Sequence, residues 1–299
     1  MGAGHGNGHS RPGARHRWRL AVACGLVGSF FLVEVVVGWL AQSLALLSDA
    51  GHMAADVVAL SSALVATRIA TRTDRTGQRT FGSYRAEVFA SGLTVLLMLG
   101  AAVYVGVEAL RRIGQTTEVA AGPMLLVGSL GLVVNVIALL LLRGGAAESL
   151  NVKGAYLEVV ADTVGSIGVI VAGVLVSRTG DGWWDTVVAL AIAGFVAVRA
   201  FLLGREVLAV LGQHAPAGLS PAEIEASLYG VPGVDGVHDL HVWTLTSGMH
   251  VATAHLMAGE GRGGEVLATA RVVLRDEYGV EHATLQVESP SSACDQTSW

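Results

Sequence analysis

The segment SDAGHMAADVVAL, residues 48–60, decides the fold of this chain, because it carries ionisable side chains inside an otherwise apolar stretch. His52 and Asp56 stand four residues apart in this segment. A second apolar stretch, AYLEVVADTVGSIGVIV, repeats the spacing with Glu158 and Asp162. Side chains at positions i and i+4 lie on the same face of a helix. Two such helices can therefore direct four ligand groups toward one point.

The composition around these stretches is that of a membrane protein. Of the 299 residues, 52% are hydrophobic and 14% are charged, and the mean hydropathy is +0.57. A helix that spans a bilayer needs about 20 mainly apolar residues. The segments that satisfy this length are 18–41, 43–70, 84–110, 121–143, 153–177 and 183–204. We therefore expect an all-α membrane domain of six spanning helices. The whole chain has 39 glycines, and small residues of this kind suit close helix packing in lipid.

The distribution of basic residues predicts how these helices are oriented. Short cytoplasmic connections carry an excess of Lys and Arg. The basic residues on the cytoplasmic side, if the N-terminus is inside, are Arg11, Arg15, Arg17, Arg19, Arg72, Arg75, Arg79, Arg85, Arg143, Lys153 and Arg205; those on the other side are Arg111, Arg112 and Arg178. Both termini are therefore expected in the cytoplasm.

The composition also excludes several classes of protein. A net charge of −5, with no basic block that contains aromatic residues, excludes nucleic acid as a partner. Cys24 and Cys294 do not make a disulfide framework. The segment before Trp18 lacks a short apolar region with a cleavage site, so we expect the first span to be retained. The single lysine among 19 basic residues is typical of a GC-rich bacterial genome and predicts the inner (plasma) membrane.

After Arg205 the composition changes to that of a small soluble domain. Ser220 and Glu223 form a capping box with proline at the first helical position, and this helix should end at Gly230. The remaining elements are strands at 234–246 and 249–257, a helix at about 264–278 and a strand at 282–288. The order α-β-β-α-β predicts a ferredoxin-like α+β domain with helices on one face of a three-stranded sheet. A domain of this size favours dimerisation.

The paired side chains inside the spans point to a metal ion. A charged group at bilayer depth is costly unless it is paired or solvated, so it marks a functional site by default. Imidazole and carboxylate groups suit a borderline divalent cation, and Zn²⁺ is satisfied by four such donors in a tetrahedron. A single intramembrane His or Asp also fits a packing or capping role. Two matching pairs favour the metal, and we expect a divalent cation to cross the membrane here.

The motifs resemble those of the cation diffusion facilitator family, the zinc-transporter type of metal/proton antiporter. The matching segments are, in order, ALLSDAGHMAAD, FGSYRAE, GAYLEVVADTVGS, VHDLHVWTLTSG and TLQVE. The resemblance covers residues 18–288 and implies proton-coupled metal efflux by a homodimer. It also implies that the transported ion binds to His52, Asp56, Glu158 and Asp162.

The same resemblance implies a second metal site, in the cytoplasmic domain, at His238, His255 and Glu288. Cys294 could complete this site, and the N-terminal histidines could collect metal; both possibilities stay open. The expected domains are a disordered cytoplasmic N-terminus (1–17), the transport domain (18–210), the cytoplasmic metal-binding and dimerisation domain (216–289) and a tail (290–299).

Glu158 departs from the family pattern, because zinc-specific relatives usually have His at this position. Two neutral imidazoles with two carboxylates carry a charge of −2, whereas one imidazole with three carboxylates carries −3. The additional oxygen donor makes the site harder, and could admit Mn²⁺, Fe²⁺, Co²⁺ or Cd²⁺ beside Zn²⁺. Alternatively, one carboxyl group keeps a proton, because crowded carboxylates hinder each other's ionisation.

Proton coupling follows in outline from the ligand types. Metal ligands must lose their protons before they bind, so metal and protons compete for the same groups.

Two other functions share part of the pattern. One is a passive channel or uptake carrier, although a closed four-ligand site favours stepwise release over rapid permeation. The other is a membrane-embedded metallohydrolase, which would need an open coordination position and a general base, as in HExxH, and this motif is absent from the sequence.

Other polar residues in the spans have more than one interpretation. Asp49 lies on roughly the same helix face as His52 and could hold its imidazole, as ligating histidines usually require. It could equally form a helix–helix hydrogen bond. Glu34 and Asn135 are expected to make packing hydrogen bonds or to line the pathway, and Asp185 is expected at the N-terminus of the sixth helix.

Overall fold

A computed structural model describes residues 17–69, 80–81, 84–113, 115, 118–146, 150–246 and 248–289. The chain divides into two compact units, one comprising 1–65 with 90–203 and the other 66–89 with 204–299. The predicted N-terminal segment, its histidines and Cys294 lie outside the described residues.

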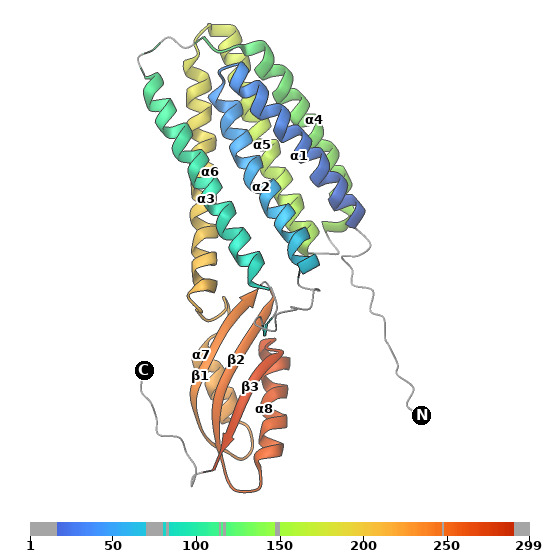
Figure 1. Cartoon of the computed structure of the whole chain (residues 1–299), viewed down its shortest axis with the longest axis vertical. Coiled ribbons are helices and arrows are strands. Elements are labelled where there is room, and N and C mark those ends of the chain that lie inside the picture. The colour runs from blue at the N-terminus through green and yellow to red at the C-terminus, as the bar shows by residue number, and fades with distance from the viewer. Residues whose placement is uncertain are drawn as a thin grey trace. The chain divides into compact units, whose positions relative to one another are not determined.

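Six long helices occupy the regions predicted to span the membrane (Figure 1). They are α1 (Arg17–Leu40), α2 (Leu44–Ile69), α3 (Arg85–Arg112), α4 (Ala121–Ala146), α5 (Leu150–Thr179) and α6 (Trp183–Leu211). The shortest has 24 residues, which at 1.5 Å per residue is about 36 Å and exceeds the ~30 Å hydrocarbon core. Among the described residues, α3 to α6 each contain an apolar span of sufficient length, and α1 contains a shorter one. The predicted helical membrane domain is confirmed.

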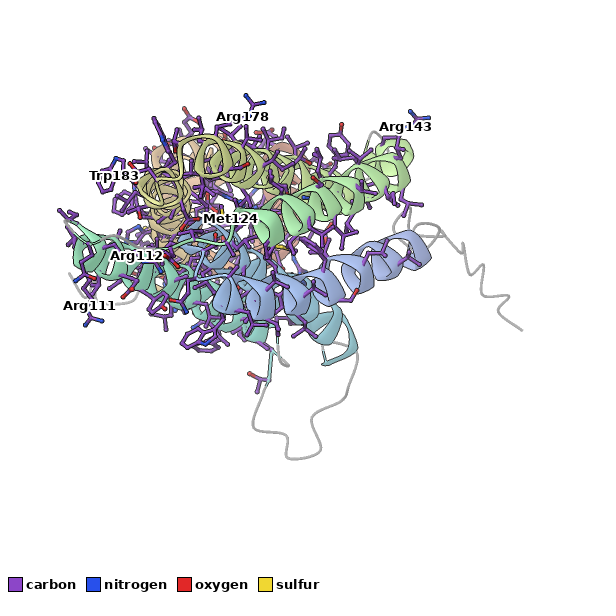
Figure 2. All side chains as sticks on the ribbon, turned by 90° about the horizontal axis from the view of Figure 1, so that it is seen from above. Arg111, Arg112, Met124, Arg143, Arg178 and Trp183 are labelled. Atoms are coloured by element: carbon purple, nitrogen blue, oxygen red, sulfur yellow. The ribbon has the colours of Figure 1, made fainter. Side chains whose placement is uncertain are left out.

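The membrane helices share one apolar core. All six contribute buried side chains to it, among them Phe30 of α1, Met53 of α2 and Met124 of α4. Figure 2, a view from above, shows Met124 among the helices, whereas Arg111 and Arg178 point away from the bundle. Many Leu, Val and Phe side chains remain exposed on the outside, as a lipid-facing surface requires.

Asp185 joins two helices at one end of this bundle. It lies in the first turn of α6, as predicted, and its buried carboxylate caps the neighbouring helix α2. The Ser43 hydroxyl donates to Asp185 Oδ1 at 2.6 Å, and the backbone N–H groups of Leu44 and Ala45 donate at 2.7 and 3.1 Å. Leu44 and Ala45 belong to the first turn of α2, where backbone N–H groups have no acceptor within their own helix. The cap therefore fixes the start of α2, two turns before His52.

The cytoplasmic domain has the predicted order α-β-β-α-β. Its elements are α7 (Pro221–Tyr229), β1 (Val234–Thr246), β2 (Met249–Ala258), α8 (Gly263–Tyr278) and β3 (His282–Glu288). The sheet order is β1-β2-β3, with β1 antiparallel and β3 parallel to β2. The predicted capping box is confirmed, because the Ser220 side chain accepts from the backbone N–H of Glu223 at 3.4 Å.

Both helices of this domain cover the same face of the sheet. Tyr278 of α8 hydrogen-bonds to Ser227 of α7 at 2.7 Å, so the helices are neighbours. Ala254 and Leu256 of β2 are buried in the core with α7 and α8. Because successive strand residues point to opposite faces, His255 between them lies on the face that the helices leave open.

Candidate metal sites

His52 of α2 and Asp162 of α5 meet inside the membrane domain. The imidazole Nε2 lies 3.5 Å from Asp162 Oδ1, and the two side chains are only 2% and 3% exposed. Two ligands of a tetrahedral Zn²⁺ with bonds of ~2.0–2.1 Å would be separated by about 3.4 Å. The two donors are therefore spaced as neighbouring ligands of one such ion.

The side chain of Arg199, from α6, lies next to His52 and contacts two of the predicted ligands. Its Nη1 lies 2.9 Å from His52 Nε2, and its Nη2 donates to Glu158 Oε2 of α5. The guanidinium carbon lies 5.9 Å from the centroid of the Phe195 ring, within the range of a cation–π contact. The same ring packs edge-on against the imidazole of His52, at 6.3 Å between centroids. We call His52, Glu158, Asp162 and Arg199 the membrane cluster.

The structure brings three of the four predicted transport ligands into this cluster. Glu158 joins it through Arg199, while His52 and Asp162 lie against each other. Asp56 follows His52 by one turn of α2, but its side chain lies outside the described residues. Exposure increases from 2% at His52 to 26% at Arg199 and 38% at Glu158. The cluster is thus least buried at Glu158.

Asp49 forms a different set of contacts next to the cluster. Its buried carboxyl group interacts with that of Glu34 in α1, which is buried as well. Asp49 Oδ1 also lies against Gly165 of α5, where an added Cβ would come within 2.2 Å of it. Asp49 thus joins α1, α2 and α5 just before the first predicted ligand. Asn135 of α4 donates to Ser166 of α5 at 3.2 Å, which confirms the predicted packing hydrogen bond.

The second predicted site is formed by the strand register of the cytoplasmic domain. His238 of β1 is paired with His255 of β2, and Glu288 of β3 is paired with Met257 of β2. Paired residues point to the same face, and His255 and Met257 are two apart on one strand. All three predicted ligands therefore lie on the open face of the sheet.

The donor atoms of these three residues converge, and we call them the cytoplasmic cluster. One ligand atom from each of His238, His255 and Glu288 lies within 4.8 Å of the other two. His238 Nε2 is 3.4 Å from Glu288 Oε2. His255 Nδ1 is 2.8 Å from Glu288 Oε1, yet this buried nitrogen lacks hydrogen-bond geometry to any described partner. Converging imidazole and carboxylate lone pairs of this kind fit a divalent transition metal and leave one coordination position open.

Arg199 is the member of the membrane cluster that sequence analysis missed. It is the one charged residue in the apolar stretch of α6 between Asp185 and Arg205. An ionisable side chain in the middle of a span marks a functional site by default, so the signal was present in the sequence. Its partners could not be predicted, because the rotation of α6 relative to α2 and α5 is not encoded in a local pattern.

Comparison with known families identifies both parts of the chain. Residues 20–211 match the family model of the cation efflux transmembrane domain, and residues 216–290 match that of the cation efflux protein cytoplasmic domain. A solved structure, the metal-bound C-terminal domain of the CzcD transporter from Cuprividus metallidurans, is 36% identical; the match covers 23% of this chain and 99% of that chain, with a TM-score of 0.23.

Several whole-length relatives are similar to the chain. The metal cation efflux system protein CzcD of Cupriavidus metallidurans is 40% identical, over 99% of this chain and 92% of the relative. The cadmium, cobalt and zinc/H(+)-K(+) antiporter of Bacillus subtilis is 30% identical, over 94% and 92%. Zinc transporter ZitB of Escherichia coli is 33% identical, over 95% and 92%. The chain therefore belongs to the cation efflux family, the predicted cation diffusion facilitators, and is a multi-pass membrane transporter with a cytoplasmic C-terminal domain and not an enzyme.

Proposed function

We propose that this chain exports Zn²⁺ from the cytoplasm in exchange for protons, and that Co²⁺, Cd²⁺, Mn²⁺ and Fe²⁺ are further cargo. The observation that carries this proposal is the buried approach of His52 Nε2 to Asp162 Oδ1 at 3.5 Å, from two different membrane helices. The relatives at 40%, 33% and 30% identity are named, in that order, a metal cation efflux system protein, a zinc transporter and a cadmium, cobalt and zinc/H(+)-K(+) antiporter. The transport ligands in this proposal are His52, Asp56, Glu158 and Asp162.

Exchange for protons follows from the chemistry of these ligands. An imidazole nitrogen and carboxylate oxygens bind a metal only after they lose their protons. When the site faces the cytoplasm, the ion binds and protons leave. When it faces the more acidic side, protonation of the imidazole and of the carboxylates weakens every bond to the ion. The inward proton gradient thereby drives metal outward, and the loss of this gradient stops net export.

The carboxylate at position 158 sets the breadth of the metal profile in this proposal. A third oxygen donor in place of an imidazole makes the ligand set harder, and so less selective for Zn²⁺ over Mn²⁺ or Fe²⁺. Glu158 is also the most exposed of the described ligands, at 38%, which suits a residue at the entrance of the site. Zinc is still transported, but the site discriminates less strongly against Mn²⁺ and Fe²⁺ than a site with a second histidine would.

The cytoplasmic cluster is proposed as a second, regulatory metal site. Its two imidazoles and one carboxylate provide three ligands on the open face of the sheet, and a fourth ligand can come from water or from another chain. We further propose that the chain is a homodimer joined through its cytoplasmic domains, which match a family model of the dimer type. The inner (plasma) membrane is the proposed location.

Transport into inside-out membrane vesicles tests the proposed function. The vesicles contain the full chain, ⁶⁵Zn²⁺ is added outside, and uptake is followed with an acidic or a neutral lumen. We expect uptake that requires the acidic lumen and that a protonophore abolishes. Vesicles with Asp162→Ala protein serve as the inactive reference. Zinc flux that ignores the proton gradient, or that runs equally in both directions, would contradict antiport and favour a channel.

A further inference from the structure

Arg199 contacts the membrane cluster through the atoms that the cargo needs. A guanidinium has no acceptor, so Arg199 donates its hydrogen bond and the lone pair of His52 Nε2 accepts it, at 2.9 Å. That lone pair is the one that faces Asp162, 3.5 Å away. The other arm of Arg199 holds Glu158 Oε2. A metal ion cannot bind His52 Nε2 while the guanidinium occupies this lone pair.

The position of Arg199 is defined by its surroundings. It lies 16 residues after the first and 12 before the last residue of α6, so about 18 Å or more of helix separates it from either end. The Phe195 ring, one turn earlier, contacts both its guanidinium and the imidazole of His52. Glu158 is the more exposed partner. The guanidinium can therefore move toward Glu158 and out of the site without leaving its ion pair.

Arg199 also changes the net charge of the site. Neutral His52 and three carboxylates carry −3, and Arg199 brings the sum to −2. A divalent ion then makes the loaded site neutral, as it would in a site of two histidines and two aspartates. Net charge in a low-dielectric interior is costly. The pair of Glu158 and Arg199 thus has the same net charge as the histidine that zinc-specific relatives usually have at position 158.

We propose that Arg199 is a built-in cation of the transport site: it occupies His52 and Glu158 when the site is empty, and the metal displaces it from His52 on loading. The inference rests on the proposed function and adds a specificity-determining residue to it. Return of the guanidinium to His52 Nε2 competes with the ion and promotes release. Arg199 therefore lowers the affinity for metal and raises the rate of turnover.

Transport kinetics of charge-changing variants test this role. Full-length protein in proteoliposomes is assayed for zinc uptake at one fixed external pH and with one fixed proton gradient, so that KM and kcat are both obtained. Arg199→Met removes both the competitor and a repulsive charge, and at a charge separation of a few ångströms KM should fall about tenfold or more. Its kcat should fall as well, because release slows. Glu158→Gln leaves the arginine uncompensated and should raise KM.

The double variant Glu158→Gln/Arg199→Met is the control that separates charge from structure. It removes one charge of each sign, so Glu158→Gln should raise KM by a clearly smaller factor in the Arg199→Met background than in the parent, a non-additive result expected for contacting groups. Arg199→Lys keeps the charge but not the two-armed donor geometry. Its KM should therefore lie between that of the parent and that of Arg199→Met. If Arg199→Met does not fold, the KM of Arg199→Lys relative to the parent tests the role of the arginine: a lowered KM supports it and an unchanged KM contradicts it.

The outcomes distinguish this inference from the proposed function. Parent protein that shows no gradient-driven zinc uptake would refute the proposed function. Parent protein that transports zinc, with an Arg199→Met variant whose KM is unchanged or raised, would refute only the role of Arg199. A strictly additive double variant would do the same. A lowered KM together with a lowered kcat in Arg199→Met, with a smaller effect of Glu158→Gln on KM in that background than in the parent, supports it.

Discussion

The membrane cluster and the cytoplasmic cluster use the same ligand types in different settings. In the membrane cluster, a guanidinium lies between His52 and Glu158. In the cytoplasmic cluster, the imidazoles of His238 and His255 contact the carboxylate of Glu288 directly. In the membrane cluster, the guanidinium of Arg199 competes with the ion for its ligands. In the cytoplasmic cluster, paired strands hold the three ligands close together before an ion binds. The difference is what we expect between a site that must release its ion in every cycle and a site that retains it.

The secondary-structure elements that carry the two clusters differ as well. Strand pairing fixes His238 opposite His255, and the ladder leaves little freedom for the donors to separate. The residues of the membrane cluster stand on α2, α5 and α6, and α6 is joined to the start of α2 by the contacts of Asp185. Alternating access requires helices that move relative to one another. A site divided among three helices can change its geometry in that motion, whereas a site on one sheet cannot.

The largest expected effect is the loss of transport in Asp162→Asn. The amide keeps the shape of the side chain but removes the charge and one acceptor, 3.5 Å from His52 Nε2. We expect zinc uptake into inside-out vesicles to fall about a hundredfold or more, the scale of losing one charged ligand in a buried site. Asp181→Asn, the same change at an exposed position between α5 and α6, is the matched control and should transport normally. Near-parental uptake by Asp162→Asn would remove the membrane cluster from the mechanism.

The next effect concerns metal selectivity at position 158. Glu158→His combined with Arg199→Leu gives a two-histidine site without the internal cation. Its Zn²⁺ to Mn²⁺ uptake ratio should rise about tenfold, because a second imidazole favours Zn²⁺ over harder ions. Glu158→His alone leaves the arginine unpaired and should transport all metals poorly. An unchanged metal profile in the double variant would show that this position does not set selectivity.

A smaller effect is expected from His255→Ala in the cytoplasmic cluster. Removal of one of three ligands should eliminate one bound zinc per chain, measured by equilibrium dialysis of the full-length protein. It should also remove the stabilisation by zinc, about 2.7 kcal/mol at a hundredfold excess over Kd. Transport at saturating zinc should persist. His241→Ala, at a histidine that is 56% exposed on β1, is the matched control; equal metal loss in both variants would argue against a defined site.

The smallest effect tests the contact between Asp49 and α5. A methyl group at Gly165 would come within 2.2 Å of Asp49 Oδ1, so Gly165→Ala must displace the buried carboxyl group. We expect a loss of about 1–2 kcal/mol in the free energy of unfolding, typical of overpacking. Gly168→Ala, one turn later and 3.5 Å from Val188 Cγ1, gains the same helix propensity without the clash and should be neutral or stabilising. Thermal unfolding in detergent measures both, and equal values would contradict the contact.

Most of the architecture followed from the sequence because local signals agreed with the tertiary structure. The apolar segments predicted the membrane helices, and the Ser220 capping box predicted the start of α7. The pairing of His238 with His255 was not predictable. The register shifts between His238 and His241, where Asp239 has a φ of +54°, and such a bulge has no simple sequence signal.

The sequence predicted that His52, Glu158 and Asp162 would lie together, but it did not predict the arginine among them. The i, i+4 spacing identified His52 and Glu158 because it needs only the geometry of one helix. The position of Arg199 depends on how α6 is rotated against α2 and α5, which is a tertiary property. The same limit applies to Asp185, whose place in the first turn of α6 was predicted while its capping of α2 was not.

The spectrum of the bound ion itself tests the central claim most directly. Full-length His255→Ala protein, which lacks a complete cytoplasmic cluster, is loaded with one equivalent of zinc and studied by X-ray absorption. We predict a single imidazole shell with oxygen ligands at about 2.0–2.2 Å and no sulfur, and loss of this spectrum in the additional Asp162→Asn variant. Two or more imidazoles, a thiolate ligand, or an unchanged spectrum after Asp162→Asn would contradict a cargo site formed by one histidine and the carboxylates of α2 and α5.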